Sequence, residues 1–212
     1  LELSASVNAD IGDAVGAGTI IDDDPWTWFV DPAGSDANDC LTESTACLTI
    51  TEAVTRAAAG DQINVARGVY EEHLTIGFDL TIVGELPLGT VIDGGAIGTV
   101  VGIGPLATVT MQGLEIRGGG DGGVANLGDL TLEDSWIHAN GDGTPTSFGG
   151  LDNQGTAQLR RTAIAGNAGD GAGGVSNAGQ LTIVNSTISG NTGGGGMGVE
   201  NLAGGSLDLV YS

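Results

Sequence analysis

Residues 173–191 read GGVSNAGQLTIVNSTISGN, and this stretch decides the fold. Its pattern returns along the second half of the chain: a Gly, an apolar residue, a variable residue and an Asn precede a short run in which apolar and polar residues alternate. Alternation with a period of two is the signature of a β-strand with one buried face. A unit of roughly 24 residues is too short for a pair of helices, but it holds two or three short strands with their corners.

Three sets of residues share this period, so we expect each unit to form one coil of a parallel β-helix. Successive coils then lie about 4.8 Å apart, and equivalent residues stack in columns. Stacked Asn side chains can form an amide hydrogen-bond ladder, so we interpret the asparagines as structural rather than as ligands. The first column is Asn126, Asn153, Asn177 and Asn201, and the second is Asn140, Asn167 and Asn191. The third set consists of the segments predicted as strands, 109–116, 130–137, 157–164 and 181–188.

The glycine content fits the same fold. The chain has 40 Gly in 212 residues but only 5 Pro and no strict three-residue period, which excludes collagen. A hydrophobic fraction of 40%, gathered in short runs, argues against a disordered chain. Sharp corners at every level need positive φ, which Gly supplies freely and Asn tolerates best among the other residues.

Earlier in the chain the strand pattern is weaker, at 62–66, 73–77, 80–84, 90–93 and 99–103, and the total indicates six to seven coils. Residues 49–59 begin with a capping box and have apolar residues at helical spacing, so we expect a short helix that covers the open end of the solenoid. The predicted class is all-β, a right-handed parallel β-helix with an N-terminal capping helix. We divide the chain into terminal strands (1–24), a cap (25–60) and the β-helix (61–212).

The two cysteines, Cys40 and Cys47, lie in a loop rich in Asp and Asn, with no further Cys or nearby His to complete a metal site. We therefore expect a local disulfide and an oxidising compartment. No apolar stretch is long enough to cross a membrane as a helix, and the start at Leu1 suggests a processed or excised piece. The expected location is extracellular or the cell surface.

The charge balance narrows the choice of partner. The chain has 27 acidic residues against five arginines and no lysine, for a formal net charge of −22. Such a surface repels nucleic acid and anionic membranes. We expect neither nucleic-acid binding nor membrane insertion.

Residues 28–84 resemble the N-terminal cap and first coils of bacterial right-handed β-helix surface proteins. They share the WFVDPAGSDANDC start, the second cysteine, the TITEAV helix and the run that ends in LTIVGE. Residues 173–191 resemble the repeat of polymorphic outer-membrane and adhesin-like proteins, which are related in fold to pectate lyases. The resemblance implies the fold, and it leaves the activity open because adhesins, surface layers and carbohydrate-active enzymes share such repeats.

Residues 1–24 end in GTIIDDD and resemble the last two strands of a Calx-beta domain. That resemblance implies calcium ligands at Asp22, Asp23 and Asp24, and an exposed acidic linker is the alternative. Two sandwich strands are not stable alone, so they either fold back on the β-helix or complete the edge of a neighbouring subunit. The second arrangement, together with contacts between solenoid ends, would build fibres.

The residues suited to catalysis form no recognisable set. Glu133 and Asp134, read as neighbours on one strand, would point to opposite faces, as would Arg160 and Arg161. We expect His73 and His138 to face solvent, and no motif for a nucleophile or a phosphate loop is present. We expect Trp26 and Trp28 to cover the apolar surface of the cap, and Trp136 is a candidate for sugar stacking.

The sequence therefore favours an extracellular structural or adhesive surface module that self-associates, and disfavours an enzyme. The alternative is a β-helix that binds or degrades polysaccharide, and clustered carboxylates, an arginine and an exposed aromatic residue would favour it. A third interpretation is a spacer within a larger surface protein. Asn185-Ser186-Thr187 matches the acceptor pattern for N-linked glycosylation, and the sequence leaves its use open.

Overall fold

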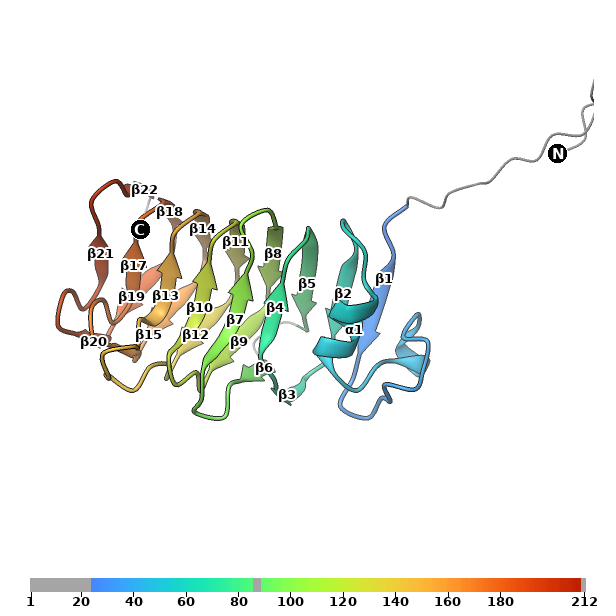
Figure 1. Cartoon of the computed structure of the whole chain (residues 1–212). Coiled ribbons are helices and arrows are strands. Elements are labelled where there is room, and N and C mark those ends of the chain that lie inside the picture. Colours follow the sequence, from blue (N-terminus) through green and yellow to red (C-terminus); the bar gives the residue numbers. More distant parts are fainter. Residues whose placement is uncertain (1–23, 86–88, 211–212) are drawn as a thin grey trace, which may run out of the picture.

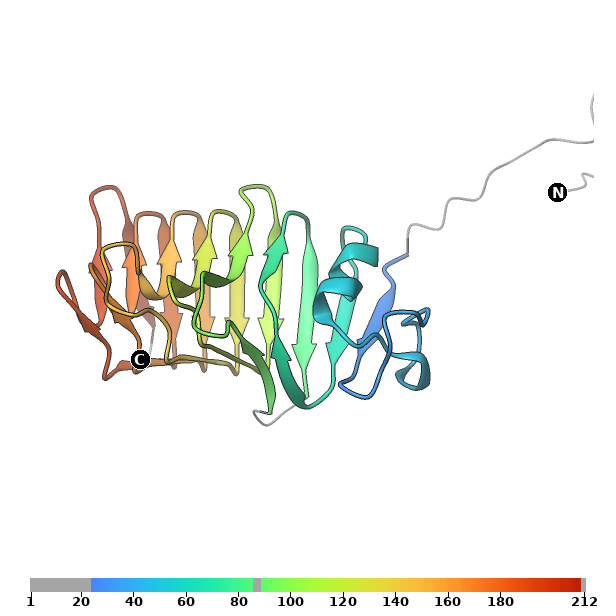
Figure 2. The ribbon, with the colours of Figure 1, turned by 60° about the horizontal axis from the view of Figure 1, so that its bottom comes forward.

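The computed structural model describes residues 24–85 and 89–210. In this part of the chain, the backbone coils along one axis, and short parallel strands from successive coils form three long sheets, as Figures 1 and 2 show. The predicted fold is confirmed: the chain forms a right-handed parallel β-helix of about six turns, the hand that parallel crossover connections almost always take.

Sheet 1 is the longest and runs the full length of the solenoid. Its eight strands are all parallel to their neighbours. In spatial order they are β1 (Thr27–Val30), β2 (Gln62–Val65), β5 (Leu80–Gly84), β8 (Thr108–Gln112), β11 (Asp129–Glu133), β14 (Thr156–Arg160), β18 (Gln180–Val184) and β22 (Ser206–Val210).

Sheets 2 and 3 have six strands each, one from each of the six coils between β2 and β21. Sheet 2 comprises β3 (Gly68–Glu71), β6 (Thr90–Asp93), β9 (Leu114–Arg117), β12 (Trp136–His138), β15 (Ala163–Ala165) and β19 (Thr187–Ser189). Sheet 3 comprises β4 (Leu74–Ile76), β7 (Thr99–Ile103), β10 (Gly122–Asn126), β13 (Gly149–Asn153), β17 (Val175–Asn177) and β21 (Val199–Asn201). A small extra pair joins β16 (Ala168–Gly169) to β20 (Thr192–Gly193).

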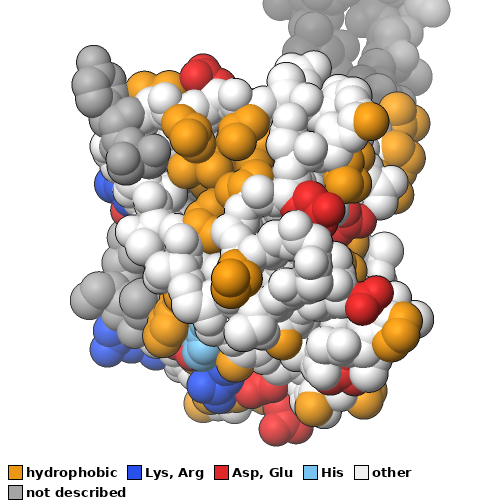
Figure 3. Space-filling view, turned by 90° about the vertical axis from the view of Figure 1, so that its left-hand side faces the viewer, with side chains coloured by type: hydrophobic (Ala, Val, Ile, Leu, Met, Phe, Trp, Pro, Cys, Tyr) orange, Lys and Arg blue, Asp and Glu red, His pale blue; other side chains and the backbone are white. Residues whose placement is uncertain are grey.

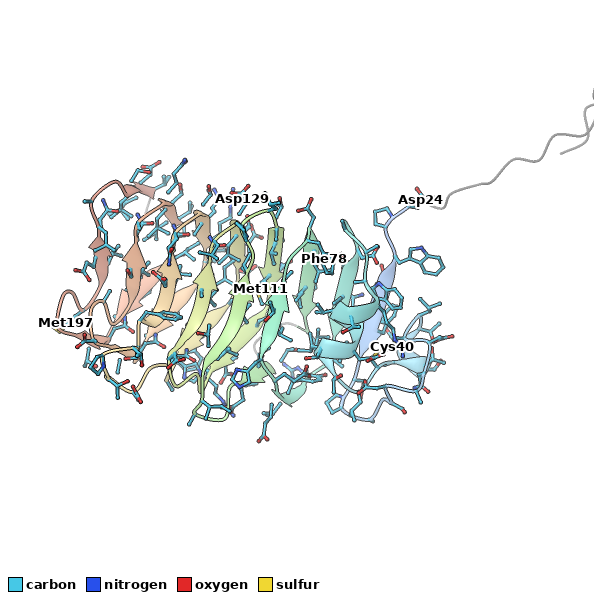
Figure 4. The ribbon with its side chains drawn as sticks, in the orientation of Figure 1. Asp24, Cys40, Phe78, Met111, Asp129 and Met197 are labelled. Atoms are coloured by element: carbon cyan, nitrogen blue, oxygen red, sulfur yellow. A yellow bond between two sulfur atoms is a disulfide. The ribbon has the colours of Figure 1, made fainter. Side chains whose placement is uncertain are left out.

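Apolar side chains from the three sheets fill the interior in vertical columns. In sheet 1 one inward column passes through Ile82, Met111, Leu132, Leu159 and Ile183, all almost completely buried. Figure 4 shows Met111 inside the solenoid. Each side chain is covered by the equivalent ones above and below, so removing a large member is expected to leave a cavity that costs about 2–5 kcal/mol.

The asparagines lie at two corners and hydrogen-bond from coil to coil. Asn126 donates from Nδ2 to Oδ1 of Asn153 (2.8 Å), and the pattern continues to Asn177 (2.7 Å) and Asn201 (2.6 Å). In the second column the Nδ2 of Asn140 and of Asn167 donate to the Oδ1 of the next member, both at 3.0 Å. The amides thus satisfy buried polar groups at corners between sheets. Asn140, Asn167 and Asn191, the members of the second column, are each at most 3% exposed.

The four segments predicted as continuous strands (109–116, 130–137, 157–164 and 181–188) each contain a corner. Each segment forms a strand of sheet 1, a corner and a strand of sheet 2. The residue at the corner has a left-handed φ, so the expectation that Asp134 and Arg161 lie within strands is wrong. The corner residues and their φ values are Gly113 (70°), Asp134 (47°), Arg161 (49°) and Asn185 (49°).

A column of hydroxyl groups follows these corner residues, and the sequence analysis missed it. The hydroxyl of Ser135 donates to the carbonyl of Glu133 and accepts from the backbone N–H of Leu114 on the coil before. Thr162 and Ser186 repeat the bond to a carbonyl two residues earlier. These hydroxyls satisfy backbone groups that the turn removes from the sheets.

The N-terminal end is closed by the predicted helix. Helix α1 (Ile50–Arg56) is shorter than the expected 49–59, with Thr49 as its N-cap. Its buried residues Ile50 and Ala53 belong to the core, and it packs against β1, β2 and β4 (Figure 1). After the C-cap residue Ala57, the carboxylate of Asp61 accepts from the N–H of Ala58.

The loop beside this helix covers the outer edge of β1. It contains a 3-10 turn, η1 (Glu43–Thr45), and the predicted disulfide between Cys40 and Cys47 is confirmed. The N–H of Phe29 donates to the carbonyl of Cys40, and the N–H of Cys47 donates to the carbonyl of Phe29. Sheet 1 therefore has no free edge at this end of the described chain.

At the C-terminal end of the solenoid, no other element covers the last strands within the described residues. The outermost strands β19, β21 and β22 are paired on one side only within the described residues. Figure 3 views this end and shows a group of hydrophobic side chains on it. Met197, Leu202, Leu207 and Leu209 are exposed there, between 38% and 67%. Self-association through this end stays a prediction.

Candidate functional site

The outer face of sheet 2 gathers five side chains with polar or aromatic character. They come from three successive coils: Asp93 from β6, Glu115 and Arg117 from β9, and Trp136 and His138 from β12. Residues two apart on a strand point to the same face, and the parallel register places Asp93 beside Arg117 and Glu115 beside Trp136. We call this set the sheet 2 cluster.

Arg117 joins the two carboxylates of the cluster. Its Nε donates to Oδ2 of Asp93 at 2.9 Å, and its NH1 lies 3.3 Å from Oε1 of Glu115. The backbone N–H of Gly95 adds a bond to the other oxygen of Asp93. Burial alone raises the pKa of the Asp93 carboxyl, but these donors outweigh it, so that pKa lies below its usual value.

His138 connects the aromatic part to the ion pairs. Its Nε2 lies 2.8 Å from Oε1 of Glu115, and its ring stacks on the Trp136 indole with centroids 3.7 Å apart and planes 22° from parallel. His138 lies on the outer face, and its side chain is only 16% exposed because Trp136 and Glu115 cover much of it. The stack and the hydrogen bond fix both rings in one orientation.

The coils that follow leave space beside the two rings. In register with Trp136 and His138 stand Ala163 and Ala165 of β15, and beyond them Thr187 and Ser189 of β19. These side chains are small, two alanines followed by two hydroxyl residues, so the rings stand above a lower surface. A ligand lying along the solenoid axis can reach one edge of the Trp136–His138 pair there.

A second charged group lies at the corner between sheets 1 and 2. Arg161 donates from Nε and NH2 to the two oxygens of Asp134, at 2.7 and 2.9 Å. Glu133 lies 3.5 Å from Arg160 and 3.4 Å from Arg161. The prediction that these neighbours point to opposite faces is therefore wrong, since each strand ends one residue before the corner. The bidentate pair ties two coils together.

The remaining aromatic and histidine residues have other surroundings. Trp28 packs against the core and donates from Nε1 to Asp61 at 2.8 Å. Trp26 is 45% exposed. His73 lies with Nδ1 2.8 Å from the carbonyl of Thr99. None of these side chains joins the sheet 2 cluster.

The calcium prediction is largely outside the described part of the chain. Asp22 and Asp23, with the whole stretch that resembles a Calx-beta domain, precede the described residues, and Asp24 is exposed. Within 24–85 and 89–210, no three His, Cys, Asp or Glu side chains come together as a metal site would require. Calcium binding, the adhesin-like identity, the domain boundaries and glycosylation at Asn185 stay predictions.

Comparisons with known proteins show no family for this chain. No protein-family model matches the sequence, and no curated protein is significantly similar to it. Among helices of the described residues, none is long and apolar enough to span a membrane.

The solved structures that are similar in shape include a lacto-N-biosidase and two pectin methylesterases. A GH136 lacto-N-biosidase from Eubacterium ramulus aligns with a TM-score of 0.47 and 17% identity, over 76% of this chain and 36% of its own. A pectin methylesterase in complex with a hexasaccharide has a TM-score of 0.48 and 18% identity, over 75% and 56%. A pectin methylesterase from Aspergillus niger has a TM-score of 0.48 and 14% identity, over 93% and 88%. The chain thus spans well under two thirds of the length of the first two.

Proposed function

We propose that this chain is an extracellular β-helix that binds an uncharged polysaccharide on the outer face of sheet 2. The observation that carries the proposal is the Trp136–His138 stack, held against Glu115 and Arg117. An indole presents a large apolar surface with a polar edge, and carbohydrate sites pair such surfaces with a few fixed polar groups.

The ion pairs give the face a preorganised set of hydrogen-bonding groups. Asp93, Glu115 and Arg117 are held to one another, so ordering them on binding costs little further side-chain entropy. Carboxylates accept hydrogen bonds from sugar hydroxyls, and the remaining guanidinium N–H groups donate to them. The low surface over β15 and β19 leaves room for further sugar units along the axis.

Charge selects an uncharged polymer over an acidic one. Four of the five arginines form ion pairs with Asp or Glu, and the chain carries a net charge of −22. A polyuronate would have to approach a strongly negative surface with its cations already neutralised. The proposed ligand therefore differs in charge from pectin.

The same geometry supports binding better than hydrolysis. A glycosidase needs one carboxylic acid that stays protonated near neutral pH, with a raised pKa. The pKa of Asp93 is instead lowered by Gly95 and Arg117. The disulfide supports an extracellular location, since such bonds persist in oxidising surroundings.

Affinity gel electrophoresis tests the proposal. Uncharged glucans, xylans and galactans and, separately, polygalacturonate are cast into native gels. We expect at least one uncharged polymer to retard the protein, Trp136→Ala to abolish the retardation, and polygalacturonate to have no effect. Trp26→Ala, an exposed tryptophan outside the cluster, is the matched control and should stay retarded. Equal retardation of Trp136→Ala and the native chain, or none with any uncharged polymer, would overturn the proposal.

A further inference from the structure

A cavity of about 510 Å³ lies at the other end of the molecule, on the outer face of sheet 1. Its floor is formed where β1, β2 and β5 end, and the disulfide loop stands beside it. Ligand pockets in proteins have volumes of roughly 300–1,000 Å³, so the size suits one or two sugar units. This site is separate from the sheet 2 cluster.

The floor is a column of outward-facing residues in strict register. Phe29 of β1 pairs with Asn64 of β2, and Asn64 pairs with Val83 of β5. Phe29 supplies an aromatic surface. Asn64 accepts from Gln62 through Oδ1, and no described residue accepts from its Nδ2, which leaves an amide donor for a ligand.

Three carboxylates surround this floor. Asp31 and Glu85 directly follow β1 and β5, and Glu43 comes from the disulfide loop. Ala33 donates its N–H to Oδ1 of Asp31, and no described residue donates to the carboxylate of Glu43. The lining residues include no arginine, and the backbone N–H of the neighbouring Arg67 donates to Oε2 of Glu85 at 3.4 Å. The cavity therefore combines an aromatic surface, an amide donor and an excess of negative charge.

We infer that this cavity binds an amino sugar through its ammonium group. The ammonium groups of such a sugar pair with the carboxylates that line the cavity, the sugar ring packs on Phe29, and Asn64 donates to a hydroxyl. A cation near an aromatic face and carboxylates is stabilised by both. A neutral sugar of the same shape lacks the ionic contribution, so the site distinguishes free amines from N-acetylated ones.

Isothermal titration with two disaccharides tests the inference. The probes are β-1,4-linked diglucosamine and its N,N′-diacetyl form, which share one skeleton and differ in charge. We expect the amine form to bind the native chain, and its affinity to fall as salt is raised. The affinity for Glu43→Gln and for Glu85→Gln should be lower by about fivefold or more. Asp208→Asn removes an exposed carboxylate from the far end of sheet 1 and should leave binding unchanged.

Three results would overturn the inference. The first is equal affinity for the acetylated and the free amine, and the second is equal affinity of Glu43→Gln and Asp208→Asn for the amine form. The third is absence of binding of the amine form at low salt. Trp136→Ala should bind the probe as the native chain does, so failure here and failure of the proposed polysaccharide face are distinguishable.

Discussion

Asn153 donates from Nδ2 to the Oδ1 of Asn177 at 2.7 Å, while its own Oδ1 accepts from Asn126. The same Nδ2 also donates to the carbonyl of Gln180, so one side chain links three coils. These bonds are buried, where an unpaired amide is costly. The relationship makes this column a measurable determinant of stability.

Asn153→Ala is expected to lower the free energy of unfolding by about 1–3 kcal/mol, because it leaves buried partners on both neighbouring coils unsatisfied. Urea denaturation followed by circular dichroism measures it. Asn201→Ala is the control at the exposed end of the same column, where Asn177 keeps its bond to the carbonyl of Ser206. Equal losses for both variants would show that the column contributes little.

Gly150→Ala is expected to destabilise the fold by about 2 kcal/mol or more. An added Cβ would lie 2.6 Å from the carbonyl of Gly174 and 2.6 Å from a methyl group of Ile164. Gly198 occupies the equivalent position on the last coil, and its Cβ would meet nothing within 4 Å. Thermal melting should therefore separate Gly150→Ala from a nearly unchanged Gly198→Ala, and similar melting temperatures would contradict the stacking.

Asp61 links stability to pH. Burial opposes its ionisation, but donors from Trp28, Ala58 and Trp26 lower its pKa. A carboxyl with a lowered folded pKa stabilises the protein above its unfolded pKa, about 3.9, and this contribution is lost as pH falls through the folded value.

Asp61→Asn should consequently cost about 1–3 kcal/mol at pH 7, since its amide cannot accept all three bonds. The difference from the native chain should shrink below about pH 4. Denaturation at pH 7 and pH 3 checks this. A difference that is constant or larger at pH 3 would contradict the assigned bonds.

Reduction of the Cys40–Cys47 disulfide should lower stability by about 2–3 kcal/mol, the value that chain entropy gives for a short loop. The loop covers the edge of β1, so hydrogen exchange should increase first in Phe29 and its neighbours. Exchange that rises evenly over all coils would show that the loop is not a local cap.

The strand periodicity predicted the solenoid, yet it did not locate the corners. The inward residues Leu130 and Leu132 are two apart, whereas Ile137 follows five residues later. That odd interval is the signal of a corner between two strands. Because the corner was missed, Asp134 was assigned to the wrong face, and its pairing with Arg161 could not be predicted.

The sheet 2 cluster was predictable in part. Alignment of the segments 109–116 and 130–137 already places Glu115 beside Trp136 on the next coil, and alternation places Trp136 and His138 on one face. The diagonal bond from His138 to Glu115 depends on rotamers, which the pattern does not contain. The cavity beside Phe29 depends on the path of the disulfide loop, for which no periodicity exists.

The most direct test of the proposed polysaccharide face uses the indole N–H signals of the chain's three tryptophans in a two-dimensional NMR spectrum. Titration with the uncharged polysaccharide that retards the protein should shift the Trp136 signal and leave those of Trp26 and Trp28 in place. Each signal is assigned by its loss in the corresponding Trp→Phe variant. A titration that shifts only Trp26 or Trp28, or none of the three, would contradict the account.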